Sequence, residues 1–392
     1  MFQTVLCRLG PIALFLALGL SSPAAEVEVA TSKNAEFVGV VGCKSSSCHG
    51  GAGEKRNQYI TWSQKDFHTR SYAILTNARS ARIAETLGLL RAAQDSSRCT
   101  VCHSPFQSVQ SVAPARLAAT AHPDEGVSCE SCHSAAERWL RGHTRKDWTY
   151  GTRVTAGMRD LRSFYVRANT CVACHQNLDS NILKAGHPEL TFELDRQSVD
   201  EPKHWRDDDP SSGVRAWLVG QAVALREMSW ALSKNDTPDV EETARWKGLN
   251  WLLARATAQQ TNLPVIDQPT SSTNPGLFMS MQQQADSLAR RAAEFRFGSD
   301  SAQQLLRTLV ATDSEFAVSK EVSQDLLFRR AQRLVLALDR LSVAATRQGS
   351  IAQKNPALIQ LFEDVRSRTD FQAPRFTEHL RNFRASIERA SR

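Results

Sequence analysis

Apolar positions recur at helical spacing along much of the chain, and no long alternating stretch indicates β-strands. A broadly apolar segment around Trp217 and Leu225 must be buried. Residues 322–345 place apolar side chains on one face of a long amphipathic helix. Residues 262–276, which include three prolines, predict a loop. We therefore expect a mainly α fold in which residues 207–392 form a C-terminal helical bundle.

Prolines mark where further helices of this bundle begin, at Pro238 with Thr237 as its N-cap, at Pro356 and at Pro374. The arginine-rich helix faces are expected to be solvated rather than to bind nucleic acid. They include Arg329, Arg330 and Arg333. Two roles are open for the bundle, which either packs on the N-terminal half or offers a docking surface to a partner.

The first 25 residues have the pattern of a secretory signal peptide. Arg8 is followed by an apolar stretch over residues 9–20 and by small residues that end at Ala25. An uncleaved anchor helix is the alternative, but about a dozen apolar residues are short for a membrane span. We expect cleavage near Ala25, export to the periplasm or beyond, and a mature chain without a transmembrane span. Cys7 leaves with the signal peptide, and eight cysteines reach an oxidising compartment.

These eight cysteines occur in pairs, and a histidine directly follows the second cysteine of each pair. Three pairs have the spacing C-x-x-C-H, the attachment signature of c-type haem. Positions i, i+3 and i+4 share a face of a helical turn, so two thiols can reach one porphyrin while the histidine ligates its iron. The first pair encloses four residues, so its loop must bulge. The four motifs are Cys43/Cys48/His49, Cys99/Cys102/His103, Cys129/Cys132/His133 and Cys171/Cys174/His175.

Paired cysteines also build zinc sites and disulfides. Neither explains why a histidine follows the second cysteine in all four motifs. We therefore predict four covalently bound haems c within residues 26–206, a domain of short helices and loops. This segment is too short to build a conventional core around each macrocycle, so the porphyrins are expected to form much of the core.

Each iron has a second axial position, for which histidine is the expected ligand. Met158 is the only methionine between the signal peptide and Trp205, whereas five histidines outside the motifs lie in this region. Paired histidines give lower potentials than histidine with methionine. The predicted distal ligands are, in order of preference, His187, His68, His143 and His204, with His122 in reserve. His379 is expected to be solvated. The haem that each distal histidine serves stays open, as does the presence of a five-coordinate iron.

The haem array resembles the cytochrome c554 family of periplasmic multihaem cytochromes. The resemblance rests on the motifs, on Trp62 and His68, and on the segments 126–133 and 185–190, and it covers about residues 36–206. It implies a mainly helical fold around closely packed haem pairs and electron transfer as the activity. In that family one haem can lack a distal ligand. The C-x4-C-H spacing and the long C-terminal half depart from the small tetrahaem members.

The formal charge of +7 does not by itself indicate a nucleic-acid partner. Each haem brings two propionates, so four haems would offset most of this charge. Arginines and lysines can pair with these propionates through charge-assisted hydrogen bonds.

Two classes of function remain. The first is an electron carrier or relay that exchanges electrons with redox partner proteins, such as other cytochromes or a periplasmic oxidoreductase. The second is a multihaem oxidoreductase in which one open haem acts on a small nitrogen or sulfur species. The chain has no C-x-x-C-K attachment site, which weakens the hypothesis of a nitrite-reductase-like enzyme. We expect the carrier and assign no catalytic residue.

Overall fold

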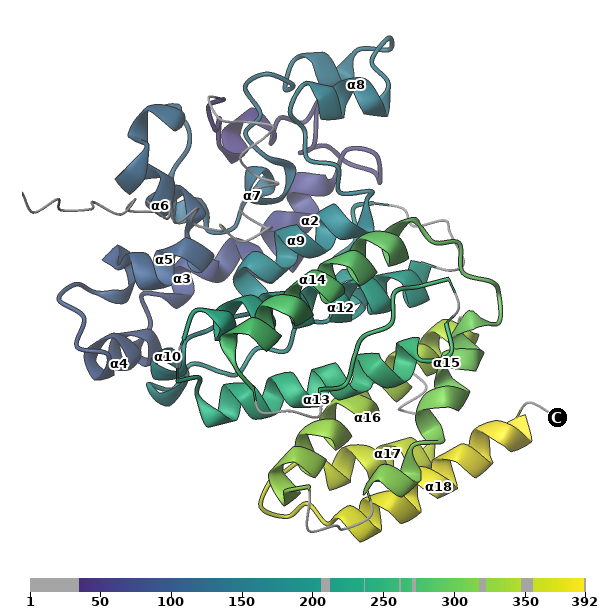
Figure 1. Ribbon diagram of the computed structural model, residues 1–392. Helices are drawn as coiled ribbons and strands as arrows, with labels where there is room; N and C mark the ends of the chain where they lie inside the picture. Colours follow the sequence, from purple (N-terminus) through teal and green to yellow (C-terminus); the bar gives the residue numbers. More distant parts are fainter. Residues whose placement is uncertain are drawn as a thin grey trace, which may run out of the picture.

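The structure is a computed structural model that describes residues 35–205, 212–235, 237–260, 262–269, 273–316, 322–346 and 355–390. The predicted signal peptide lies outside the described residues. Regular structure in the described ranges is helical, apart from an isolated β-bridge between Phe37 and Leu117. The prediction of a mainly α fold is confirmed, and Figure 1 shows short helices in the N-terminal part and long ones in the C-terminal part. Within these same ranges, no helix combines the length and apolarity needed to cross a membrane.

The N-terminal half consists of short helices joined by loops. Its α-helices are α2 (Gln58–Lys65), α3 (Ser71–Ile74), α4 (Ala78–Thr86), α5 (Ser97–His103), α6 (Pro105–Val112), α7 (Cys129–His133), α8 (Tyr150–Thr155), α9 (Phe164–His175), α10 (Ser180–Lys184) and α11 (Leu194–Asp200). Short 3-10 helices lie between them, including η1 (Val40–Gly42), η2 (Phe67–Arg70) and η5 (Pro123–Glu125). Its apolar clusters are small, one around Phe37 and Phe106 and one around Leu75.

The C-terminal half is a bundle of longer helices. They are α12 (Ser212–Ser233), α13 (Val240–Thr257), α14 (Pro275–Glu294), α15 (Ser301–Val310), α16 (Gln324–Thr346), α17 (Pro356–Asp364) and α18 (Ala373–Ala390). Polar side chains fix several of the starts. Asn274 caps α14 and Asn355 caps α17. Asp239, not Thr237, caps α13 by accepting from the backbone N–H groups of Glu241 and Glu242 at 2.9 and 3.1 Å.

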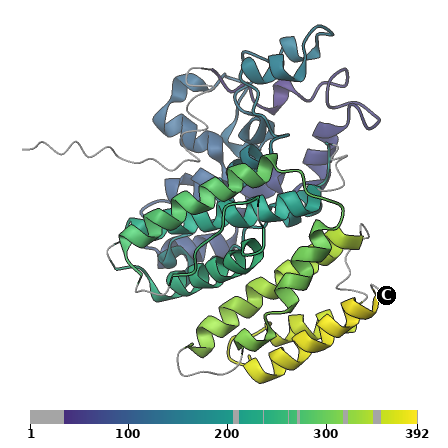
Figure 2. The same cartoon turned by 45° about the vertical axis from the view of Figure 1, so that its right-hand side comes forward.

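Helix α12 is the centre of the bundle. It packs against α14, α9, α13 and α11, and Figures 1 and 2 show α14 running alongside it. Nearly all its side chains between Val214 and Leu232 are buried, which explains why its sequence is apolar around the whole helix rather than on one stripe. One apolar core runs from Phe164 on α9 through this helix to Phe383 on α18. The helix that carries the fourth motif thus shares its core with the bundle.

A buried arginine adds a polar link between α9 and the bundle. The side chain of Arg226 on α12 is fully buried. Its guanidinium donates to Asp286 on α14 at 2.9 Å, and to Tyr165 at 3.1 Å and Asn169, both on α9. Glu227 accepts two further bonds from it at 2.9 and 2.7 Å. Every component of this network has a partner, as a buried charge requires.

Two expectations about polar residues of the bundle are wrong. Arg333 is buried, and the side chain of Arg329 is only 11% exposed, because α16 packs against other helices on several sides and presents no fully solvated face. Arg329 instead pairs with Glu241 at 2.9 Å. His379 is also not freely solvated, since its side chain is only 21% exposed and its Nδ1 lies 2.7 Å from a carboxylate oxygen of the buried Asp364.

Candidate cofactor site

Three of the four motifs lie on helical turns, as their spacing predicts. Helix α7 consists of the third motif itself, and the second and fourth motifs form the C-terminal ends of α5 and α9. The motif histidine is the last residue of each helix. Two cysteines and one histidine therefore project from one side of each turn.

The first motif forms a non-helical turn that absorbs its two additional residues. The backbone N–H of Cys48 donates to Ser45 O at 2.9 Å, and that of His49 donates to Cys43 O at 3.2 Å. The second bond closes the loop across the motif and returns His49 to the neighbourhood of Cys43. Cys43 is buried and Cys48 is exposed.

Each motif histidine faces one histidine from elsewhere in the chain. The ring centres are 6.1 Å apart for His49 and His143 and 6.3 Å apart for His103 and His187. They are 6.2 Å apart for His133 and His204 and 6.1 Å apart for His175 and His68. We name these the first, second, third and fourth pairs, after the motif in each.

The four separations fit one metal ion held between two imidazoles. A ligating histidine nitrogen lies about 2 Å from its metal, so two rings on opposite sides of one ion have centres roughly 6 Å apart. Ring pairs without a metal also have centres about 4.5–7 Å apart, so the fit to a shared metal depends on the same separation recurring at all four motifs. The ring planes are nearly parallel in the first pair, at 19°, and strongly crossed in the others, at 69°, 61° and 88°.

Burial keeps two of the motif histidines neutral. It lowers the pKa of His133 to about 4, and the nearby His204 and Arg159 lower it further in the same direction. Burial, together with His68 and His103, lowers the pKa of His175 to about 4. Neutral imidazole is the form that binds a metal, so both rings are ready to ligate at pH 7.

Hydrogen bonds at Nδ1 orient several rings of these pairs. The Nδ1 atom of His49 lies 2.9 Å from Gln58 Oε1, and that of His103 lies 3.2 Å from Ser71 O. His143 and His187 use the carbonyl oxygens of Leu140 and Pro188. Such bonds fix the tautomer that leaves Nε2 free to face the partner ring.

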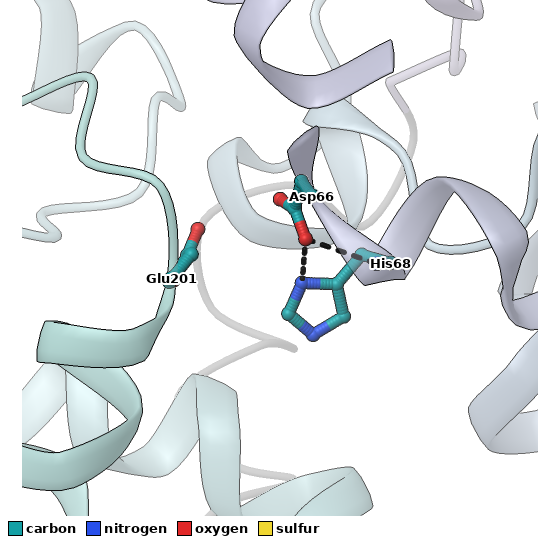
Figure 3. Close-up of side chains that lie close together, drawn as sticks. All are labelled: Asp66, His68 and Glu201. Carbon is teal, nitrogen blue, oxygen red and sulfur yellow. Dashed lines mark hydrogen bonds and ion pairs between the residues drawn. The ribbon is translucent and has the colours of Figure 1, made fainter. Parts of the chain in front are cut away.

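His68 differs because its partner is a carboxylate. Asp66 Oδ1 accepts from both the Nδ1–H and the backbone N–H of His68, each at 2.9 Å, and the Asp66 side chain is only 9% exposed. Figure 3 shows Glu201 beside the two residues, and the potential ligand atoms of all three lie within 4.8 Å of one another. Burial acts to raise the pKa of Asp66, but the hydrogen bonds from His68 outweigh it and lower the pKa. The carboxylate is therefore charged at neutral pH.

The four motifs adjoin one another in a definite order. The side chains of Cys43 and Cys129 lie close enough to shift each other's pKa, so the first motif lies against the third. Cys102 and Cys174 make the same contact between the second and fourth motifs. Cys132 and Cys171 lie close enough to interact electrostatically. The order in space is first, third, fourth, second.

Glu130, inside the third motif, holds the start of the described chain against this motif. Its buried carboxylate accepts from the backbone N–H groups of Val38 at 3.1 Å, Gly39 at 2.7 Å and Ala136 at 2.6 Å. Gly39 adopts φ +75°, which a residue with a Cβ rarely adopts, and a Cβ here would lie 2.5 Å from Thr120 O. The sequence indicates no such role for Glu130, because it stands at a variable position of the motif.

The remaining candidates lie apart from the four pairs. His122 is exposed and caps η5, with its backbone N–H bound to Glu125 Oε1 at 3.2 Å.

The eight cysteines of the described residues are free of disulfides. Within the described residues, one group of three potential ligands could hold a metal ion, and it consists of Asp66, His68 and Glu201. This group contains no cysteine, whereas the usual structural zinc sites contain at least two. Asp66 and Glu201 were not predicted, although an aspartate two residues before a candidate ligand is a signal that could have been used.

Residues 42–134 match the family model of cytochrome c554 and c-prime. The predicted resemblance is confirmed over this segment, which includes the first three motifs and His68 and ends before the fourth motif. The match supports a c-type cytochrome with covalently bound haem c and a role in electron transfer. No curated protein and no solved structure matches the chain.

Proposed function

We propose that this protein is an exported tetrahaem cytochrome c that carries electrons between redox partner proteins. The cysteines of the four motifs would attach haem c, and the two histidines of each pair would be the axial ligands. A signal peptide over residues 1–25 and a periplasmic location belong to the same proposal, as does the tetrahaem domain over residues 26–206.

The observation that carries the proposal is the equal spacing of the four pairs. Four separations between 6.1 and 6.3 Å fit four bis-histidine irons. Each motif histidine faces one further histidine, and these four are the ones that the sequence favours as distal ligands. When bound, haem supplies a one-electron couple whose potential depends on axial ligands, hydrogen bonds and burial.

The residues would contribute rigidity and a fixed route. Two covalent bonds and two axial ligands at each position leave little freedom for movement, which suits outer-sphere transfer. The proximity of the motif cysteines supports a row with the first and second pairs at its two ends and the third and fourth pairs in its interior. We infer that electrons enter and leave through the two ends.

The test of the cofactor is a haem count. Protein produced with an export signal and haem-attachment machinery should contain four haems c per chain by pyridine haemochrome assay. Two or fewer would contradict the proposal. A colourless product with bound zinc or with cystines at the motif cysteines would do the same.

The alternative is an oxidoreductase with one open iron. It is disfavoured because every motif histidine faces a second histidine ring at a separation that fits one shared iron. Low-temperature EPR of the ferric protein separates the two functions. A carrier should show low-spin iron only and ignore added nitric oxide or cyanide, whereas a high-spin signal that shifts with either ligand would favour the enzyme.

A further inference from the structure

The fourth pair has a different electrostatic environment from the other three. Among the pair histidines, which all lie in the described residues, His68 is the one whose Nδ1 is bonded to a carboxylate. The four histidines of the first and second pairs use neutral amide or backbone oxygens at Nδ1. This contrast does not depend on any bound group.

A carboxylate at Nδ1 makes the imidazole a stronger donor through Nε2. Negative charge drawn toward the ring raises its basicity and stabilises the ferric over the ferrous iron. The low exposure of Asp66 strengthens this effect, because less water screens the charge. Glu201 adds a second carboxyl group within 4.8 Å; burial and then Asp66 raise its pKa, while His68 and Arg167 act in the opposite direction.

We propose that Asp66, supported by Glu201, acts as a positioning residue that gives the fourth pair the lowest reduction potential of the four. This inference rests on the proposed tetrahaem function. The fourth pair lies in the interior of the row, between the third and second pairs. Electrons would therefore rest at other positions and cross the fourth pair in an uphill step, which separates the two ends of the route.

The experiment uses the full mature holoprotein and the variant Asp66→Asn. Asparagine keeps an oxygen that can cap η2 but replaces the charged acceptor of His68 by a neutral one, as in the other pairs. In a spectropotentiometric titration, the lowest of the four midpoint potentials should rise and the other three should stay. We expect at least a tenfold change in the reduction equilibrium of that site, which is about 59 mV for one electron.

The matched control is Asp147→Asn, which removes an exposed carboxylate paired with Arg145. It should leave all four potentials in place. The variant His68→Ala assigns the site, because the lowest-potential low-spin component should become high-spin. An unchanged lowest potential in Asp66→Asn would overturn the inference. So would an equal shift of all four, or loss of a higher-potential component in His68→Ala.

A second variant tests the inference if Asp66→Asn disturbs the binding of His68 to the iron. Glu201→Gln leaves the bond between Asp66 and His68 intact and should raise the same lowest potential by a smaller amount. No shift in this variant would then overturn the inference. The outcomes remain separate from those of the proposed function, because a wild-type protein with fewer than four haems fails the haem count before any potential is compared.

Discussion

At the scale of single residues, the four histidine pairs indicate which side chains could share one iron. A proximal histidine is defined by the cysteine before it, but a distal histidine has no local signature. His122 and His187 illustrate this, since both precede a proline in a polar segment. Only His187 lies opposite a motif histidine. The two differ because the fold of the surrounding loop brings the His187 ring, but not the His122 ring, close to a motif histidine.

Replacing His187 by alanine should convert one iron to the high-spin state while all four haems stay covalently bound. The thioether bonds do not involve His187, so only the axial position is lost. EPR and the haem count of the same sample measure the two effects. His122→Ala is the matched control and should leave the spectrum low-spin. If the two variants behaved alike, the pairing of His187 with His103 would be wrong.

Replacing Glu130 by alanine should destabilise the N-terminal half. Three backbone N–H groups would lose their acceptor, and an unsatisfied buried group costs about 1–3 kcal/mol. We expect a lower thermal midpoint and faster proteolysis near residue 38. Glu130→Gln keeps one acceptor oxygen and should lose less. A midpoint unchanged in Glu130→Ala would show that these bonds contribute little.

At the scale of elements, α9 joins the two halves of the molecule. Its C-terminal end carries the fourth motif, and its earlier turns pack on α12 and α14. Tyr165 and Asn169 bind Arg226 on one side, and Phe164 and Val172 enter the bundle core. The bundle therefore positions the helix that would hold one of the haems.

Replacing Arg226 by methionine should destabilise the protein by roughly 3–5 kcal/mol, because removing one partner of a buried ion pair leaves uncompensated charge. Glu227 and Asp286 would lose their contacts with this buried cation, although Asp286 would keep Arg290. Chemical denaturation followed at the haem absorption and by helix content measures the effect. Tyr165→Phe is a milder control that removes one hydrogen bond, worth about 1 kcal/mol. Equal losses in both variants would contradict this ranking.

Helix α11 gives the fold a dependence on pH. Burial, followed by the neighbouring Glu193, raises the pKa of Asp195 to about 7, while Arg340 acts in the opposite direction. A carboxyl group with a raised folded-state pKa binds more protons in the native state, so its contribution to stability is largest at low pH. That contribution is lost progressively as pH rises from the ordinary carboxyl pKa, about 4, to about 7, and changes little above this. The thermal midpoint should decrease from pH 6 to pH 7, and Asp195→Asn should flatten this slope. An identical slope in the variant would exclude Asp195 as the cause.

At the scale of the whole molecule, the C-terminal bundle is more than an appendage to a cytochrome. The N-terminal half has only small apolar clusters of its own, whereas the large core spans both halves. The domain boundary at residue 206 stays a prediction. The cysteines and nearly all histidines precede it in the sequence, but α9, which also precedes it, belongs to the core of the C-terminal bundle.

A chain truncated after residue 206 should therefore not retain a stable fourth site. Its α9 would expose Phe164, Tyr165 and Val172, which are buried in the full chain. We expect the truncated protein, produced with the same haem-attachment machinery, to be degraded or to show fewer than four low-spin irons. Haem count, EPR and limited proteolysis against the full chain measure this. Four low-spin haems in a protease-resistant fragment would show that the N-terminal half folds alone.

The sequence by itself determined the four cysteine–histidine motifs and the helical character of both halves. These depend on short-range spacing, since the positions i, i+3 and i+4 meet on any helical turn. Tertiary structure alone decided which distal histidine faces which motif, the order of the pairs, and the carboxylate behind His68. The partners in each case come from distant parts of the chain, so their meeting depends on how helices and loops pack. The burial of Arg333 and the pairing of His379 depend on packing in the same way. A charged residue type predicts an exposed side chain only where no other helix covers that position.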